Sequence, residues 1–117
     1  MENHKLVLPG HLNHYGFLFG GHLLNWVDEY AYIAASVEYP DSDFVTVAMD
    51  KVEFKKSVRE GTILIFVVDK TREGKTSVQF SVSVYSTKAK AEKDMIFSTK
   101  VTCVGIDEEG NKRAIPR

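Results

Sequence analysis

The sequence from Asn13 to Ala35 is NHYGFLFGGHLLNWVDEYAYIAA, and it predicts a polar, glycine-punctuated loop that leads into one long helix. Little of the segment from about Phe19 to Glu38 is suited to water, so we expect a core helix there. Pro40 predicts its end, because proline disfavours helix in the preceding residue. The apolar residues recur at intervals of three and four, as on a buried helical face: Leu23, Leu24, Val27, Ala31, Ala34 and Ala35.

Asp28 interrupts this apolar pattern. On a helical wheel of about 100° per residue, four apolar or aromatic neighbours fall within about 60° of it: Leu24, Ala31, Tyr32 and Ala35. A carboxylate on such a face is unfavourable unless it is paired, which makes Asp28 a candidate functional residue. The wheel alone also allows a structural carboxylate at a seam between subunits. The adjacent Glu29 is expected on a solvated face.

Beyond the helix, the apolar period changes to the alternation of strands. A phase shift near Asp50 predicts a bulge. An edge strand is expected at 6–8, and four longer strands are expected at 44–54, 63–68, 76–85 and 96–106. Polar connectors are expected at 69–75, 87–94 and 107–113. Short connections make the sheet antiparallel. The predicted fold class is therefore α+β, with a curved antiparallel sheet of about five to six strands around one central helix.

Composition narrows the functional classes. With 117 residues, the chain is expected to form one domain, residues 1–117. Its 15 basic and 16 acidic residues nearly balance, which argues against nucleic acid or a membrane surface as a partner. We expect no signal peptide and no spanning helix. The single cysteine, Cys103, predicts a packed, inert thiol and a cytoplasmic location.

Several candidate residues also have simpler interpretations. Asn13 alone could be an ordinary turn or helix-capping residue, and Gly20-Gly21 could serve tight packing alone. The spacing of His11, His14 and His22 matches no common zinc pattern, so we expect no metal.

Residues 13–29, NHYGFLFGGHLLNWVDE, follow the pattern Asn-x-x-Gly-x-x-Phe-Gly-Gly, with an aspartate seven residues after the last glycine. Three more segments follow in order: VTVAMDKVEFKKSVREG (45–61), GKTSVQFSVSVYS (74–86) and TKVTCVGIDEEGNKRAIP (99–116). Together they resemble the acyl-CoA thioesterases of the hotdog fold, over nearly the whole chain. One departure is Tyr15, where some relatives have asparagine.

The resemblance implies roles for particular residues. Asp28 matches the catalytic carboxylate, and Asn13 matches the loop amide that positions the attacking water or the substrate. Gly20 or Gly21 matches the backbone N–H that polarises the thioester carbonyl. The segment near the coenzyme A nucleotide is matched by Gly74, Lys75, Thr76 and Ser77, and Arg59 is a further candidate for coenzyme A binding.

By this resemblance we expect hydrolysis of acyl-CoA to a free acid and coenzyme A, without a metal or other cofactor, by a homodimer or a hexamer of three dimers. Gly20 and Asp28 are eight residues apart, or roughly 12 Å along a helix. Both must approach one carbonyl, so we expect a site shared across a two-fold axis. The alternatives are a non-catalytic acyl-CoA binder or sensor on the same fold, and a hotdog dehydratase or hydratase that uses His22 with a carboxylate.

Overall fold

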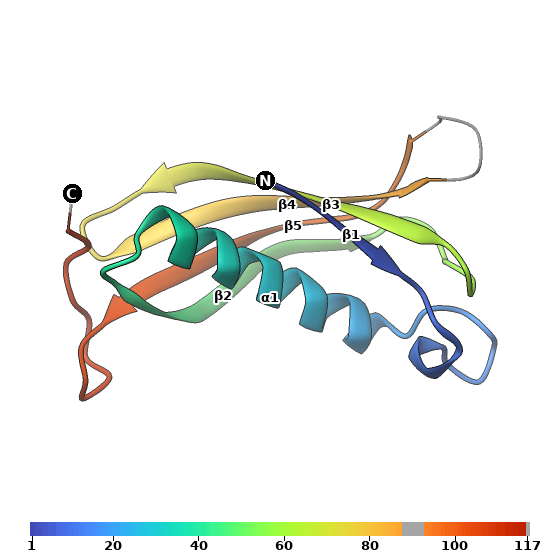
Figure 1. Ribbon diagram of the computed structural model, residues 1–117, viewed down its shortest axis with the longest axis horizontal. Coiled ribbons are helices and arrows are strands. Elements are labelled where there is room, and N and C mark those ends of the chain that lie inside the picture. Colours follow the sequence, from blue (N-terminus) through green and yellow to red (C-terminus); the bar gives the residue numbers. More distant parts are fainter. Residues whose placement is uncertain (88–92, 117) are drawn as a thin grey trace.

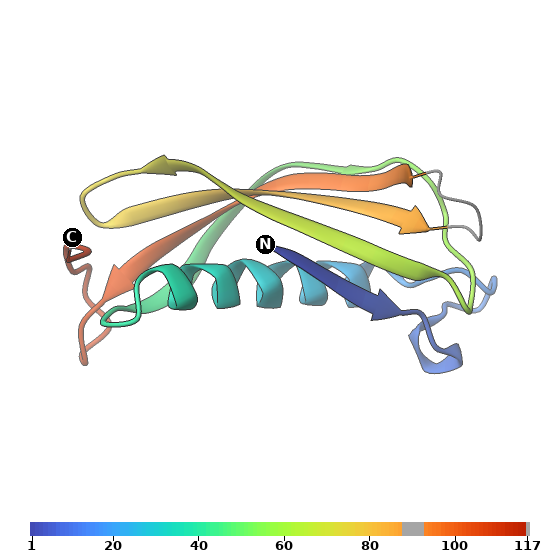
Figure 2. The ribbon, with the colours of Figure 1, turned by 45° about the horizontal axis from the view of Figure 1, so that its top comes forward.

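A computed structural model describes residues 1–87 and 93–116 of this chain. In these residues one α-helix, α1 (Gly20–Glu38), lies beneath one arched antiparallel sheet (Figures 1 and 2). The sheet order is β1-β3-β4-β5-β2, and the strands are β1 (Glu2–Leu6), β2 (Asp43–Phe54), β3 (Ile63–Glu73), β4 (Ser77–Thr87) and β5 (Lys93–Ile106). The predicted α+β architecture is confirmed.

The helix begins and ends close to its predicted limits. The residues of its predicted core face are buried, except Leu24, which is half-buried. The expectation of a core helix buried on nearly every side is wrong for the protomer. Tyr32 is 44% exposed and Val37 is 64% exposed, on a face that the sheet does not cover. The outer face of the helix therefore presents apolar side chains that are available to other surfaces.

Small residues set the distance between helix and sheet. Ala31 and Ala35 are 0% exposed and belong to the hydrophobic core. Larger aromatic side chains fill the space on the β3 side, where the Trp26 ring meets the edge of Phe66 at 6.4 Å and Tyr30 lies 4.8 Å from the same ring. These contacts fix the helix in a close-packed interior.

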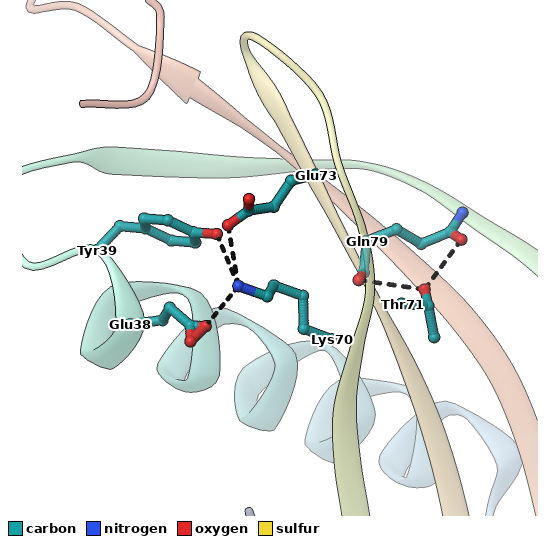
Figure 3. A network of polar contacts seen from close by, with 6 residues as sticks. All are labelled: Glu38, Tyr39, Lys70, Thr71, Glu73 and Gln79. Atoms are coloured by element: carbon teal, nitrogen blue, oxygen red, sulfur yellow. Dashed lines mark hydrogen bonds and ion pairs between the residues drawn. The ribbon is translucent and has the colours of Figure 1, made fainter. Parts of the chain in front are cut away.

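A polar network holds the C-terminal end of α1 against β3 (Figure 3). The Lys70 ammonium donates to Tyr39 at 3.2 Å and to Glu73 at 2.9 Å, and it pairs with Glu38 at 3.1 Å. The last turn of the helix contains no basic residue of its own. Lys70 supplies the positive charge that a helix C-terminus favours, from a neighbouring strand.

Strand β2 forms one edge of the sheet and is irregular. Its pairing with β5 shifts register between Thr46 and Ala48 and again between Asp50 and Glu53, and Lys51 has a φ of 54°. The predicted bulge near Asp50 is confirmed. Four apolar side chains of this edge strand are exposed: Val45, Val47, Val52 and Phe54.

Two strand predictions need correction. The edge strand expected at 6–8 is β1, which runs from Glu2 to Leu6. Its inner face carries polar side chains such as Lys5, whose ammonium lies 5.2 Å from the centre of the Trp26 ring. The charged segment 69–75 is strand as far as Glu73, because β3 continues beyond the core with exposed side chains. Of the connector expected at 87–94, residues 88–92 lie outside the described residues, and its ends belong to β4 and β5.

The predicted turn at 107–113 is confirmed. Asp107 accepts hydrogen bonds from the backbone of Glu109 at 3.0 Å and of Asn111 at 2.8 Å. The following residues return to the sheet, where Arg113 N donates to Gly105 O at 2.8 Å. Across the described residues, no helix has the length and apolarity needed to cross a lipid bilayer.

Candidate active site

The loop before α1 is organised by Asn13. Its side-chain oxygen accepts hydrogen bonds from Tyr15 N at 2.9 Å and Phe17 N at 3.1 Å, and its backbone carbonyl accepts one from Gly16 N at 3.0 Å. Gly16 has a φ of 82°, which glycine tolerates. The simpler interpretation of Asn13 as a turn residue is therefore correct for its oxygen. Its Nδ2 donates to no atom among residues 1–87 and 93–116, so its amide donor is available to a ligand.

Gly20 and Gly21 follow this loop and occupy the first two positions of α1. Phe19 precedes them as the N-cap residue, and no side chain caps this end of the helix. The first N–H groups of a helix have no acceptor within it, and they carry the positive end of the helix dipole. A side-chain carbon at Gly20 would lie 3.4 Å from the Phe54 ring, so glycine leaves this approach open. Free N–H groups of this kind are the donors that can stabilise an oxyanion in enzyme sites.

The carboxylate of Asp28 is held by Thr46. Thr46 Oγ1 donates to Asp28 Oδ1 at 2.5 Å, and both residues are half-buried. This distance is typical of a short hydrogen bond to a charged acceptor. Thr46 could not be identified from the sequence, because a threonine in a strand of alternating residues has no distinguishing signal. The bulge that follows Thr46 in β2 appears only in the strand pairing, so no sequence signal marked this residue.

An open groove of about 510 Å³ runs beside Asp28 between α1 and β2. Its lining combines polar and apolar side chains: Asn25, Asp28, Glu29, Tyr32, Phe44, Val45 and Thr46. Gly20 lines a separate hollow of about 210 Å³ with Leu18, Leu23 and residues 54–58. Within one protomer the proposed oxyanion donor and the carboxylate thus face different hollows, as their eight-residue separation predicts.

The residues predicted to bind coenzyme A fall into two groups. The turn from Gly74 to Ser77 lies at the C-terminal end of α1, at the opposite end of the molecule from the loop that precedes the helix (Figure 1). Gly74 N donates to Ser77 O at 2.8 Å, Thr76 O accepts from Gly105 N, and Lys75 O accepts from Ile115 N. Arg59 lies near the N-terminal end of the helix, with its guanidinium 4.7 Å from the Phe17 ring. One protomer does not bring these two groups together.

The histidines lie away from Asp28. The ring of His22 is 5.3 Å from His11 and 6.3 Å from Trp26, on a different face of the helix from the groove. His22 and Asp28 therefore do not form, within one protomer, the histidine–carboxylate pair that a dehydratase would need. Desolvation lowers the pKa of His11, and the charges of His22 and Lys5 lower it further.

Metal ligands are also dispersed in the part of the chain that the structure describes. Among those residues, no group of three histidine, cysteine, aspartate or glutamate side chains is placed to hold an ion. His14 packs against Tyr15 at 4.0 Å instead. The expectation of chemistry without a metal or cofactor stays a prediction.

Known proteins resemble this chain in sequence and structure. A family profile described as the thioesterase superfamily matches residues 15–92. Acyl-coenzyme A thioesterase 11 of Mus musculus is 27% identical over 117 residues, and the match covers 99% of this chain but 20% of the mouse protein. The hexameric thioesterase of Yersinia pestis superposes with a TM-score of 0.90 at 26% identity, covering 98% of this chain and 93% of that one.

The acyl-CoA hydrolase of Staphylococcus aureus, solved with butyryl coenzyme A, coenzyme A and coenzyme A disulfide, has a TM-score of 0.90 at 28% identity, covering 99% of this chain and 71% of that one. Alanine variants of that hydrolase replace an asparagine, an aspartate and a threonine. Its asparagine and aspartate are separated by as many residues as Asn13 and Asp28 are here. This chain belongs to the thioesterase superfamily, and its helix and sheet form the hotdog fold.

Proposed function

We propose that this protein hydrolyses acyl-CoA thioesters to a free carboxylic acid and coenzyme A, with Asp28 as the reacting carboxylate. The observation that carries this proposal is the short hydrogen bond from Thr46 that holds Asp28 on the wall of an open groove. Membership of the thioesterase superfamily supports it. The matching separation of the substituted asparagine and aspartate in the Staphylococcus aureus hydrolase supports the choice of Asn13 and Asp28.

The chemistry follows from these groups. A water oxygen attacks the thioester carbonyl while Asp28 accepts its proton, and a helix N-terminal N–H at Gly20 or Gly21 stabilises the oxyanion. The intermediate collapses, the C–S bond breaks, and the coenzyme A thiolate leaves and takes a proton. Asp28 can alternatively attack the carbonyl and form a mixed anhydride that water then hydrolyses. Single turnover in ¹⁸O-labelled water identifies the anhydride route when label enters the Asp28 carboxylate, since general-base attack by water places label only in the product acid.

The active unit in this proposal is at least a homodimer. β2 is an edge strand, and its exposed valines and Phe54 make that edge of the sheet apolar. Uncovered sheet edges of this kind tend to pair with the edge strand of another chain. Tyr15 and Phe19 add exposed rings in the loop before α1, at 72% and 54%. Pairing β2 with a second β2 would join the two sheets and bring the loop of one subunit toward the Asp28 groove of the other. A hexamer of three such dimers is the next level of assembly in the proposal.

The activity is tested by free-thiol release from a panel of short, long and aromatic acyl-CoA substrates. We expect turnover by wild type and a loss of two or more orders of magnitude in Asp28→Ala. Asp41→Ala is a matched control, because it removes an exposed carboxylate from the turn after the helix. A wild-type protein that binds the panel but hydrolyses none of it would be a binder or sensor instead.

The shared site is tested by mixing Asn13→Ala with Asp28→Ala. If Asn13 of one subunit serves Asp28 of the other, each mixed dimer contains one intact site, and complete exchange restores about a quarter of wild-type activity. Sites confined to one subunit would give no recovery. Subunit exchange is verified separately with two distinguishable tags, so that a negative result refutes the shared site.

A further inference from the structure

The thiol of Cys103 contacts the threonine that holds the carboxylate of the proposed site. Cys103 on β5 pairs with Thr46 on β2 and is 0% exposed. Its Sγ is 4.0 Å from Thr46 Oγ1, which in turn is 2.5 Å from Asp28 Oδ1. Thr46 therefore contacts both the buried thiol of Cys103 and the carboxylate of Asp28, which lines the groove. The sequence predicted burial of this thiol, which is confirmed, but assigned it no part in the site.

The direction of the hydrogen bonds follows from the available protons. The Thr46 hydroxyl has one proton, and it donates this proton to Asp28, because an ionised carboxylate can only accept. Oγ1 then has only lone pairs to offer, so the S–H of Cys103 must be the donor to Thr46. Burial raises the pKa of the Cys103 thiol, and the nearby Asp28 also raises it, against a lowering by Thr46. The thiol therefore keeps its proton at neutral pH.

We propose that Cys103 is a positioning residue, whose S–H holds the Thr46 hydroxyl in the rotamer that donates to Asp28. The part of this inference that concerns catalysis rests on the proposed thioesterase function. A donor at Oγ1 polarises the Thr46 hydroxyl and strengthens the hydrogen bond that it makes. An aliphatic side chain in place of Cys103 would fill the same buried space and supply no donor.

Infrared spectroscopy tests the hydrogen bond without any turnover. Cys103 is the single cysteine of the chain, so its S–H stretching band has one assignment. Thr46→Val removes the acceptor and preserves the shape, and we expect the band to move to the higher frequency of an unbonded thiol. Thr46→Ser keeps the hydroxyl and should leave the band in place. A band at the same frequency in wild type and Thr46→Val would overturn the proposal.

A second variant guards against a folding defect in Thr46→Val. Asp28→Asn keeps Thr46 but removes the negative charge that polarises its hydroxyl, so the S–H band should move in the same direction by a smaller amount. Thermal unfolding verifies that each variant is folded before its spectrum is interpreted. A band that Asp28→Asn leaves unchanged would contradict the coupling between the two hydrogen bonds.

Kinetics test the consequence for catalysis with a matched pair of variants. Cys103→Ala leaves a void and Cys103→Val fills it, but both remove the donor. If the donor matters, both lower kcat by about two- to fivefold, to the same extent and with KM unchanged, as expected for a weak S–H hydrogen bond. A kcat equal to wild type, or values that differ between the variants and follow their stabilities, would overturn the positioning role.

The two proposals fail in different ways. If wild type hydrolyses no acyl-CoA, the proposed function fails, and the infrared band still decides whether Cys103 donates to Thr46. If wild type is active and the band is insensitive to Thr46→Val, the thioesterase function stands and the role of Cys103 falls.

Discussion

Thr46→Val is the substitution whose effect follows most directly from the geometry of the site. Valine replaces the hydroxyl with a methyl group and keeps the branched shape, so the strand and the groove wall are preserved. The hydrogen bond that it removes, 2.5 Å long, ends on a carboxylate. Hydrogen bonds to charged groups contribute about 1.5–3 kcal/mol. If the whole contribution is needed in the transition state, kcat/KM falls by about 10- to 150-fold.

The assay is steady-state thiol release with the best acyl-CoA of the panel, for wild type, Thr46→Val and Thr46→Ser. Serine retains the donor, so Thr46→Ser should stay within a few-fold of wild type. We expect the loss in Thr46→Val to fall mainly on kcat, because Thr46 contacts the carboxylate and not the substrate in the proposal. Wild-type activity in Thr46→Val, or equal losses in both variants, would refute the view that this hydrogen bond positions Asp28.

Three further predictions concern stability. Phe66→Ala should lower the free energy of unfolding by about 3–5 kcal/mol in urea titrations, because the ring is 0% exposed in the core, and a change below about 1 kcal/mol would contradict the packing. Gly105→Ala should destabilise by about 1–3 kcal/mol, since the new carbon would lie 2.8 Å from Arg113 O. Gly10→Ala is its control, with no atom within 4 Å, and equal midpoints for the two would refute the clash. The pKa of His11 is lowered in the folded protein, so below the unfolded-state pKa of about 6.5 the folded state binds fewer protons than the unfolded state. The free energy of unfolding should therefore decrease as the pH falls from about 6.5 toward the folded-state pKa. Urea midpoints at pH 7.5 and pH 5 should fall further for wild type than for His11→Asn, and parallel losses would exclude His11 as the cause.

The parts of the fold with a clear hydrophobic period could be predicted from the sequence. The helix had helical spacing and a proline after it, and β4 alternated without interruption from Val78 to Val84. β1 could not be located in this way, because Lys5 and Asn3 point inward and the apolar residues Leu6 and Leu8 are exposed. Where the aliphatic part of a lysine side chain covers the core, the strand has no alternation of apolar residues that the sequence could reveal.

The residues of the candidate site could be proposed from the sequence only where they lie within one stretch of it. Asn13 and Asp28 belong to a single motif, and their spacing along the chain is what makes them candidates. Thr46 and Cys103 come from two strands, and they meet Asp28 only because the register of β2 and β5 places them opposite one another. Pairing register depends on the whole sheet, including bulges, so local patterns do not report it.

The alanines on the sheet-facing side of α1 also constrain how this protein can vary. Ala31 and Ala35 are fully buried where the helix meets the sheet, one and two turns beyond Asp28. A larger side chain at either position would lift the helix and draw Asp28 away from Thr46 before it unfolded the protein. In a library that randomises the helix, these positions should accept only the smallest residues under selection for activity. Selection for folding alone should admit a wider set, and the difference between the two sets would measure how tightly the carboxylate must be held.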